Sequence, residues 1–82
     1  NSLKVYPNPV RDEKLTITSN SLAGQSVNIS LYNMLGQLVL SSETDFGSNG
    51  EMPLEIGKQS SGIYFLEISS KKGTSKEKLI IK

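Results

Sequence analysis

The 82-residue sequence predicts an all-β protein, an antiparallel β-sandwich of about seven short strands in a single domain. Three observations lead to this fold class. Apolar residues alternate with polar ones in short runs, which is the pattern of a strand with one buried face. Turn-forming Gly, Asn, Ser and Asp separate these runs at intervals of about 8–12 residues. No stretch shows the apolar spacing of an amphipathic helix, and the length allows one small core.

The N-terminal part of the chain predicts two strands. The first spans residues 3–6 and ends at Pro7-Asn8-Pro9, because a proline cannot donate a hydrogen bond to a neighbouring strand. The second spans residues 14–19, where apolar and threonine side chains alternate between the two faces.

The middle of the chain predicts a hairpin. A Gly-containing turn over residues 20–25 leads into the clearest strand, residues 26–32, and a second strand covers residues 38–42. Between them, Asn33 and Gly36 tolerate a positive φ, which favours a tight connection. The side chains expected to face the core from the first of these two strands are Val27, Ile29 and Leu31.

The C-terminal part predicts three further strands. Residues 51–56 form a weak strand at the edge of a sheet, because Pro53 lies inside it. Residues 63–69 form a central strand, because apolar side chains occupy both of its faces at its start. After a turn over residues 70–75, the last strand covers residues 76–82.

The composition argues against several classes of function. The chain has no His and no Cys, so it lacks the side chain that titrates near neutral pH, the thiolate nucleophile and the usual transition-metal ligands. We therefore expect no enzyme, no cofactor and no metal. The net charge of +1 provides no overall field for nucleic acid. No apolar run approaches the ~20 residues of a membrane-spanning helix, so direct membrane insertion is not expected.

The carboxylates and serines offer only weak candidate sites. Asp12 and Glu13 are neighbours on an extended segment and point apart, unlike the converging pair of a glycosidase. Glu43 and Asp45 could supply oxygens to calcium, but the spaced ligands and closing Glu of a calcium loop are missing. The many serines have no His to activate them. Solvated turns account for all of these residues.

Positive charge gathers at the C-terminal end. Five lysines lie between residues 71 and 82, against one glutamate. Lysines on a terminal strand can protect a sheet edge from aggregation, or they can form a basic surface that a partner reads. We keep both interpretations. The five aromatic residues form no ladder for stacking bases, and most are expected in the core. The candidate partner-recognition residues are Lys76, Lys78, Leu79, Ile80, Ile81 and Lys82.

Three segments together resemble one family. Val-Tyr-Pro-Asn-Pro stands at residues 5–9, Leu-Tyr-Asn-Met-Leu-Gly-Gln at residues 31–37, and Gly-Ile-Tyr-Phe-Leu-Glu-Ile at residues 62–68. The chain then ends in Lys-Leu-Ile-Ile-Lys at residues 78–82. In order and spacing these segments resemble the type A C-terminal sorting domain of the type IX secretion system, or Por secretion system, of Bacteroidota. The resemblance covers essentially the whole sequence.

The resemblance implies a fold and a function. Such domains are Ig-like β-sandwiches at the C-terminus of secreted proteins, and they act as export signals. The attached N-terminal cargo crosses the inner membrane by the Sec route and then passes the outer membrane to the cell surface. The implied partners are the translocon, a shuttle protein and a sortase-like protease that often removes the domain and joins the cargo to anionic lipopolysaccharide. Because the sequence begins at Asn1 without an initiator Met, we expect residues 1–82 to be one such domain from a larger protein.

By the same resemblance, the residues that match family motifs have two expected roles, which overlap at Gly62 and Tyr64. The C-terminal residues 78–82, with Gly62 and Tyr64, match late motifs in which recognition is thought to concentrate. The motif residues expected to be mainly structural are Tyr6, Pro7, Asn8, Pro9, Gly36, Gly62 and Tyr64. An alternative function is a generic Ig-like or fibronectin-like spacer or a carbohydrate-binding module of a bacterial surface protein. A sugar-binding module should carry exposed aromatic residues along one face.

Overall fold

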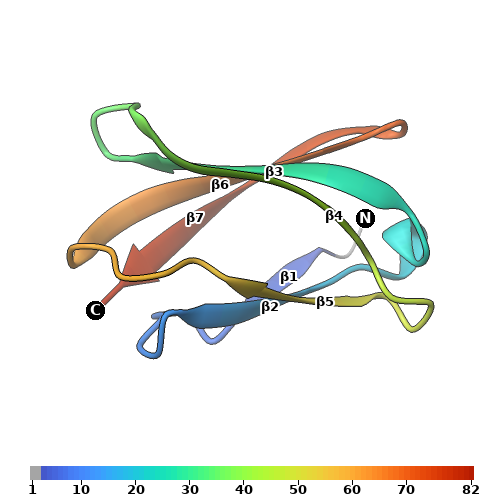
Figure 1. Cartoon of the computed structure of the whole chain (residues 1–82), viewed down its shortest axis with the longest axis horizontal. Helices are drawn as coiled ribbons and strands as arrows, with labels where there is room; N and C mark the ends of the chain where they lie inside the picture. Colours follow the sequence, from blue (N-terminus) through green and yellow to red (C-terminus); the bar gives the residue numbers. More distant parts are fainter. Residues whose placement is uncertain (1–2) are drawn as a thin grey trace.

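Two antiparallel sheets packed face to face make up the computed structural model, which describes residues 3–82 (Figure 1). The smaller sheet has the strand order β1-β2-β5 and the larger one β4-β3-β6-β7. This arrangement confirms the predicted all-β, Ig-like sandwich of seven strands. The strands are β1 (Lys4–Tyr6), β2 (Lys14–Thr18), β3 (Ser26–Asn33), β4 (Leu38–Asp45), β5 (Glu51–Glu55), β6 (Gly62–Ser70) and β7 (Gly73–Ile81). The predictions that concern Asn1 and Ser2 lie outside the described residues.

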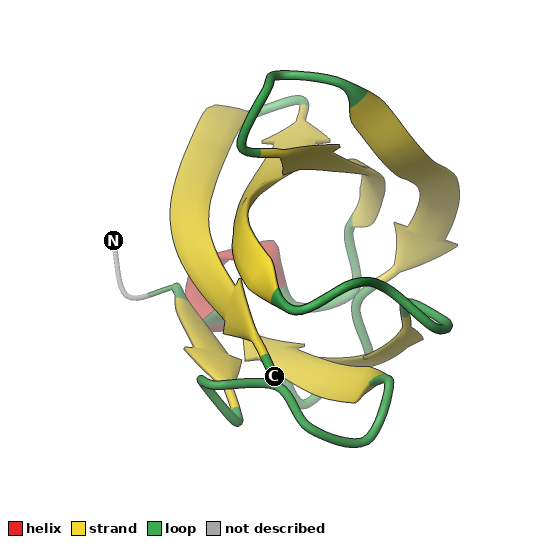
Figure 2. Ribbon diagram, turned by 90° about the vertical axis from the view of Figure 1, so that its left-hand side faces the viewer, coloured by secondary structure: helices red, strands yellow, loops and turns green. Residues whose placement is uncertain are grey.

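The core lies between the two sheets, and it follows from the alternation in the sequence. Every second side chain of β2, β3, β5 and β6 is buried, and the residues between them are more exposed. Figure 2 shows the sheets from the side, with the end of β7 close to the smaller sheet. The buried apolar residues are Val10, Leu15, Ile17, Leu22, Val27, Ile29, Leu31, Phe46, Met52, Leu54, Ile56, Tyr64, Leu66, Ile68, Leu79 and Ile81.

The predicted places of two strands in the sheets, β5 and β6, are confirmed. β5 is an edge strand of the smaller sheet, as expected from its proline, and β7 is an edge strand of the larger sheet. β6 is central, between β3 and β7. The second apolar face at the start of β6 comes from Phe65, whose side chain points out of the sandwich and is 42% exposed.

Several boundaries differ from the sequence-based expectation. β4 continues beyond Ser42, because its pairing with β3 extends to Asp45. β7 begins at Gly73 instead of residue 76, since Gly73 pairs directly with Ser70 across a tight turn. Residues 20–22 form a short 3-10 helix within the predicted turn. The expectation for the aromatic residues was wrong in part: Phe46 and Tyr64 are buried, Tyr32 is half-buried, and Tyr6 and Phe65 are exposed.

A short segment near the N-terminus closes part of the free edge of β7. We call residues 8–10 the N-terminal clasp. The Val10 N–H donates to the Ile80 carbonyl at 2.7 Å, and the Lys82 N–H donates to the Val10 carbonyl at 2.9 Å. These bonds form a parallel bridge between Val10 and Ile81, 71 positions apart. The clasp therefore links the two ends of the chain.

The Asn8 side chain extends the clasp along β7. Its amide oxygen accepts from the Ile80 N–H at 3.1 Å, and its amide nitrogen donates to the Lys78 carbonyl at 3.4 Å. An asparagine side chain carries a donor and an acceptor like a peptide group, so it can replace a neighbouring strand at this point.

Within residues 3–82, no helix is long and apolar enough to cross a membrane.

Candidate functional site

The register of the larger sheet lines up polar and aromatic side chains on the face turned away from the smaller sheet, here called the outer face. Tyr32 of β3 stands opposite Phe65 of β6, and Phe65 stands opposite Lys78 of β7. One row further along, Glu67 of β6 stands opposite Lys76 of β7. Directly opposed side chains on one face are neighbours. The outer face therefore combines two aromatic rings with the lysines of the last strand.

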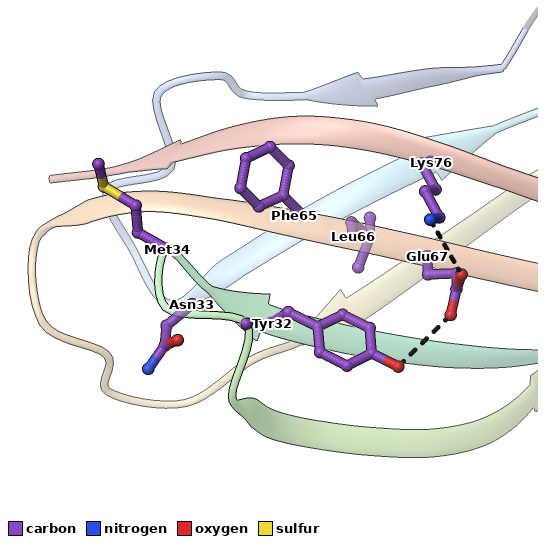
Figure 3. A pocket seen from close by; sticks show the side chains of 8 residues that line it. Tyr32, Asn33, Met34, Phe65, Leu66, Glu67 and Lys76 are labelled. Carbon is purple, nitrogen blue, oxygen red and sulfur yellow. Dashed lines mark hydrogen bonds and ion pairs between the residues drawn. The ribbon is translucent and has the colours of Figure 1, made fainter.

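A chain of polar contacts crosses these rows (Figure 3). The Tyr32 hydroxyl donates to Glu67 Oε1 at 3.4 Å, and Glu67 Oε2 lies 3.9 Å from Lys76 Nζ. The Lys76 side chain is 75% exposed and that of Glu67 28% exposed, so the ion pair adds little to stability. It does balance part of the charge of Lys76. Among the described residues, Lys78 has no carboxylate within ion-pair distance, and its charge faces solvent.

A shallow pocket of about 400 Å³ lies at one end of the outer face, where β3 turns into β4. Figure 3 shows Phe65 and Met34 on the apolar side of this pocket and Tyr32 and Glu67 on the polar side. The lining is therefore mixed, and among the described residues no buried side-chain nitrogen or oxygen lacks a hydrogen-bond partner. The pocket is lined by Tyr32, Asn33, Met34, Gly36, Phe65, Leu66, Glu67 and Lys76.

The turn beside this pocket explains the Asn and Gly of the middle motif. Asn33 Oδ1 accepts from the backbone N–H groups of Leu35 and Gln37, at 2.9 and 3.0 Å. Gly36 has φ 83°, a conformation that favours glycine. The tip carries its apolar side chains outward: Met34 is 68% and Leu35 is 84% exposed. The polar residues of the motif thus hold the turn, and its apolar residues face solvent.

The predicted partner-recognition residues, Lys76 and residues 78–82, have side chains on two different faces of the sheet. Lys76, Lys78 and Ile80 point to the outer face and are exposed, and Lys82 is exposed after the end of β7. Leu79 and Ile81 are buried in the core, because alternate side chains of a strand point to opposite faces. The side chains of these two residues therefore do not reach the exposed outer face, and partner recognition by this set of residues stays a prediction.

The other family-motif residues lie at the start of β6 and in the segment that runs from the end of β1 into the clasp. Tyr64 is buried and its hydroxyl donates to the Ser60 carbonyl at 2.7 Å, which fixes the loop before β6. Gly62 begins β6 opposite Ile81. Tyr6 and Pro7 are exposed, whereas Pro9, within the clasp, is half-buried.

Sequence reasoning missed the part played by Val10. Val10 is fully buried, although the alternation placed it in no strand. A lone apolar residue directly after the Pro-Asn-Pro turn, within a polar stretch, was the available signal. Its bonding partner lies at the other end of the chain, which no local pattern reveals.

The carboxylates weighed as calcium ligands lie in a strand. Glu43 and Asp45 belong to β4, and Asp45 accepts a hydrogen bond from the Ser26 hydroxyl at 2.7 Å. Within the described part of the chain, no three acidic, His or Cys side chains gather as a metal site would require.

The clasp gives a first testable prediction. Asn8→Ala removes both side-chain hydrogen bonds to β7 and should lower the free energy of unfolding by about 1–2 kcal/mol, because each such bond contributes roughly 0.5–1.5 kcal/mol. Urea unfolding followed by circular dichroism measures this loss. Asn49→Ala, which removes a loop contact to the Glu51 N–H, is the matched control. An unchanged midpoint for Asn8→Ala would contradict this account of the clasp.

Comparisons with known proteins agree with this fold. A family model described as a secretion system C-terminal sorting domain matches residues 4–82. Among solved structures, dimeric latent PorU from Porphyromonas gingivalis is similar at a TM-score of 0.63 and 24% identity, over 96% of this chain and 9% of that one. CopC from Methylosinus trichosporium OB3b is similar at a TM-score of 0.54 and 13% identity, over 98% of this chain and 91% of that one. At these identities the likenesses concern the fold alone, and the chain spans less than a tenth of PorU. No curated protein matches the sequence.

Proposed function

Because the chain belongs to the family of type IX secretion system C-terminal sorting domains, we propose that it is the signal that directs an attached cargo protein through the outer membrane. The observation that carries this proposal is the family match, which covers residues 4–82 and so includes every strand. In this role the domain is a substrate of the secretion machinery and performs no chemical step. Its assignment to type A rests on the motif resemblance.

The structure supports a signal that is read in its folded state. A folded signal must present its information on an accessible surface, and the outer face of the last strand and the lysines at its end are accessible. The charges of Lys78 and Lys82 have no carboxylate partner among residues 3–82. We propose that these two lysines and the outer face of β7 form the surface that the machinery contacts.

The finer steps follow from the family resemblance. We propose that a shuttle protein and the translocon receive the folded domain after the cargo has reached the periplasm. A sortase-like protease then removes the domain, and the cargo is attached to anionic lipopolysaccharide at the cell surface. The cleavage point would lie before the first strand, so removal would leave the sandwich intact.

A localisation assay tests the proposal. A reporter with an inner-membrane signal peptide and this domain at its C-terminus is expressed in a Bacteroidota host with or without a working translocon. The reporter should reach the surface or the medium only when the translocon works. A known sorting domain on the same reporter is the positive control. Retention of the folded reporter in the periplasm of both strains, with the control exported, would refute the proposal.

One observation favours the alternative of a carbohydrate-binding module. Tyr32 and Phe65 lie side by side on the outer face, next to a pocket, and exposed aromatic rings can stack on sugars. The two functions separate in one measurement, since Phe65→Ala would remove sugar binding on a glycan array but leave a sorting signal that is still exported.

A further inference from the structure

The free edge of β7 is open along only half of its length. The N–H and C=O of successive strand residues point alternately to the two neighbouring positions. In β7 the groups of Ile80 point away from β6, because they bond to the clasp. By the same alternation, the groups of Thr74, Lys76 and Lys78 also point away from β6. These groups form the outward edge of the strand.

The clasp occupies the C-terminal half of this edge. The carbonyl of Lys78, both groups of Ile80 and the N–H of Lys82 bond to residues 8–10. Towards the other end, no described residue bonds to the N–H groups of Thr74, Lys76 and Lys78 or to the carbonyls of Thr74 and Lys76. We call this stretch, residues 74–78, the open edge.

A hollow between the two sheets lies beside the open edge. It has a volume of about 300 Å³, and Thr74 and Ser75 form part of its rim. Its lining is mixed: the apolar residues are Leu3, Leu22 and Ile68, and the others are polar residues or glycine, mainly serines. Side chains of a strand paired to the open edge would point alternately into this hollow and over the outer face.

Positive charge predominates around the open edge, because residues 71–78 contain four lysines and one glutamate, Glu77. Lys71 and Lys72 form the turn before β7, and Lys76 and Lys78 extend from the open edge itself. Glu67 balances only Lys76, and Lys72 donates to the Ser21 carbonyl at 2.8 Å without losing its charge. A strand placed here therefore meets positive charge on the outer face, and on the other side a hollow whose lining is part apolar and part polar.

We propose that the open edge binds an extended segment of a partner protein in which acidic and apolar side chains alternate. The segment adds a fifth strand to the larger sheet through the free main-chain groups of residues 74–78. Its acidic side chains stand beside Lys76 and Lys78 on the outer face, and its apolar side chains enter the hollow. This inference adds a contact site to the proposed function. It rests on the proposed function only for the assignment of the partner to the secretion machinery.

The clasp sets the register of this added strand. Because residues 8–10 occupy the edge from the Lys78 carbonyl onward, a partner strand cannot slide towards the C-terminus. At the other side the lysine turn ends the edge. The paired part of the segment is thus limited to about five residues, which places its charges beside Lys76 and Lys78.

A peptide titration tests the contact directly. The probe is the capped peptide Thr-Val-Glu-Val-Glu-Val-Thr, and the matched probe carries Lys in place of Glu. With ¹⁵N-labelled protein, the acidic peptide should shift the amide signals of Thr74, Lys76 and Lys78 and slow their exchange with solvent. The basic peptide should leave these signals in place. Equal shifts from both peptides, or shifts confined to the β4 edge, would overturn the proposal.

Two variants of Lys76 separate the contribution of the main-chain N–H at the edge from the contribution of the side-chain charge. Lys76→Thr and Lys76→Pro both remove the ammonium group, but only the proline also removes the N–H that faces the partner. Proline should weaken peptide binding at least tenfold relative to threonine. Ser41→Pro, on the opposite edge of the same sheet, controls for a proline in an edge strand. Melting temperatures establish that each variant is folded, and equal binding by the two Lys76 variants would refute strand addition.

The same pair in the export assay distinguishes the two proposals. One outcome is that the wild-type reporter is exported and that Lys76→Pro and Lys76→Thr are exported to the same extent. In that case the open edge is not the contact, although the sorting function stands. If the wild-type reporter stays in the periplasm, the sorting function fails, and the peptide titration still decides whether the edge accepts a strand.

Discussion

Leu79→Ala is expected to lower the free energy of unfolding by about 2–5 kcal/mol, the range for removing a fully buried leucine side chain. Leu79 has no exposed surface and packs between the sheets from β7. A domain of this size has a total stability of roughly 4–12 kcal/mol, and no Cys is present to form a disulfide. The substitution should therefore unfold much of the protein at 37 °C. Thermal unfolding measures the loss.

The neighbouring residue supplies the control. Ile80 follows in the same strand but points to the outer face and is 36% exposed, so Ile80→Ala should cost about 1 kcal/mol or less. In the export assay, Leu79→Ala should reduce the secreted reporter far more than Ile80→Ala. Equal losses of stability would mean that β7 does not pack as described. Full export of an unfolded Leu79→Ala domain would mean that the machinery reads a linear sequence.

Reversing two charges at the end of the chain should abolish export and leave the fold intact. Lys78→Glu with Lys82→Glu changes two exposed side chains whose charges have no ion-pair partner among residues 3–82. Exposed substitutions of this kind usually alter stability by less than roughly 0.5 kcal/mol. A partner that binds the lysines would instead meet repulsion, which acts on recognition. The fraction of reporter outside the cell, compared with the melting temperature, separates the two effects.

A second double variant gives the same change in net charge elsewhere. Lys4→Glu with Lys14→Glu alters exposed residues of β1 and β2 in the smaller sheet, and it breaks only a surface ion pair with Glu55. Export should continue with this variant. If both pairs of substitutions stopped export equally, total charge would govern recognition and the proposed surface on β7 would be wrong.

The alternation of apolar and polar side chains predicted the sandwich because the buried face of each strand can be recognised from the sequence of that strand alone. Ile29 and Leu31 in β3, or Leu66 and Ile68 in β6, alternate with polar neighbours and need no long-range information. The end of β4 was missed because residues 43–45 have no apolar side chain, so nothing in their composition marks a strand. They are held in the sheet by pairing with β3 alone.

The candidate site was predicted less completely than the fold. The lysines of the last strand are visible in the sequence, but whether Lys78 or Leu79 faces solvent depends on the register with β6. The open edge depends on the clasp, and the clasp depends on contacts such as that between Asn8 and Lys78, 70 positions apart. Such contacts depend on how the sheets stack, and they produce no periodic pattern in the sequence.

The parallel bridge between Val10 and Ile81 also bears on how the domain responds to mechanical force. A pull that enters before β1 and is resisted at the end of β7 draws the two bridged segments past each other. The bonds between them lie across the direction of the force, so all four carry the load together, as in shear, and do not open in sequence, as in unzipping. When force is applied to the last strand, the domain should therefore remain folded while it transmits that force to the polypeptide attached before the first strand.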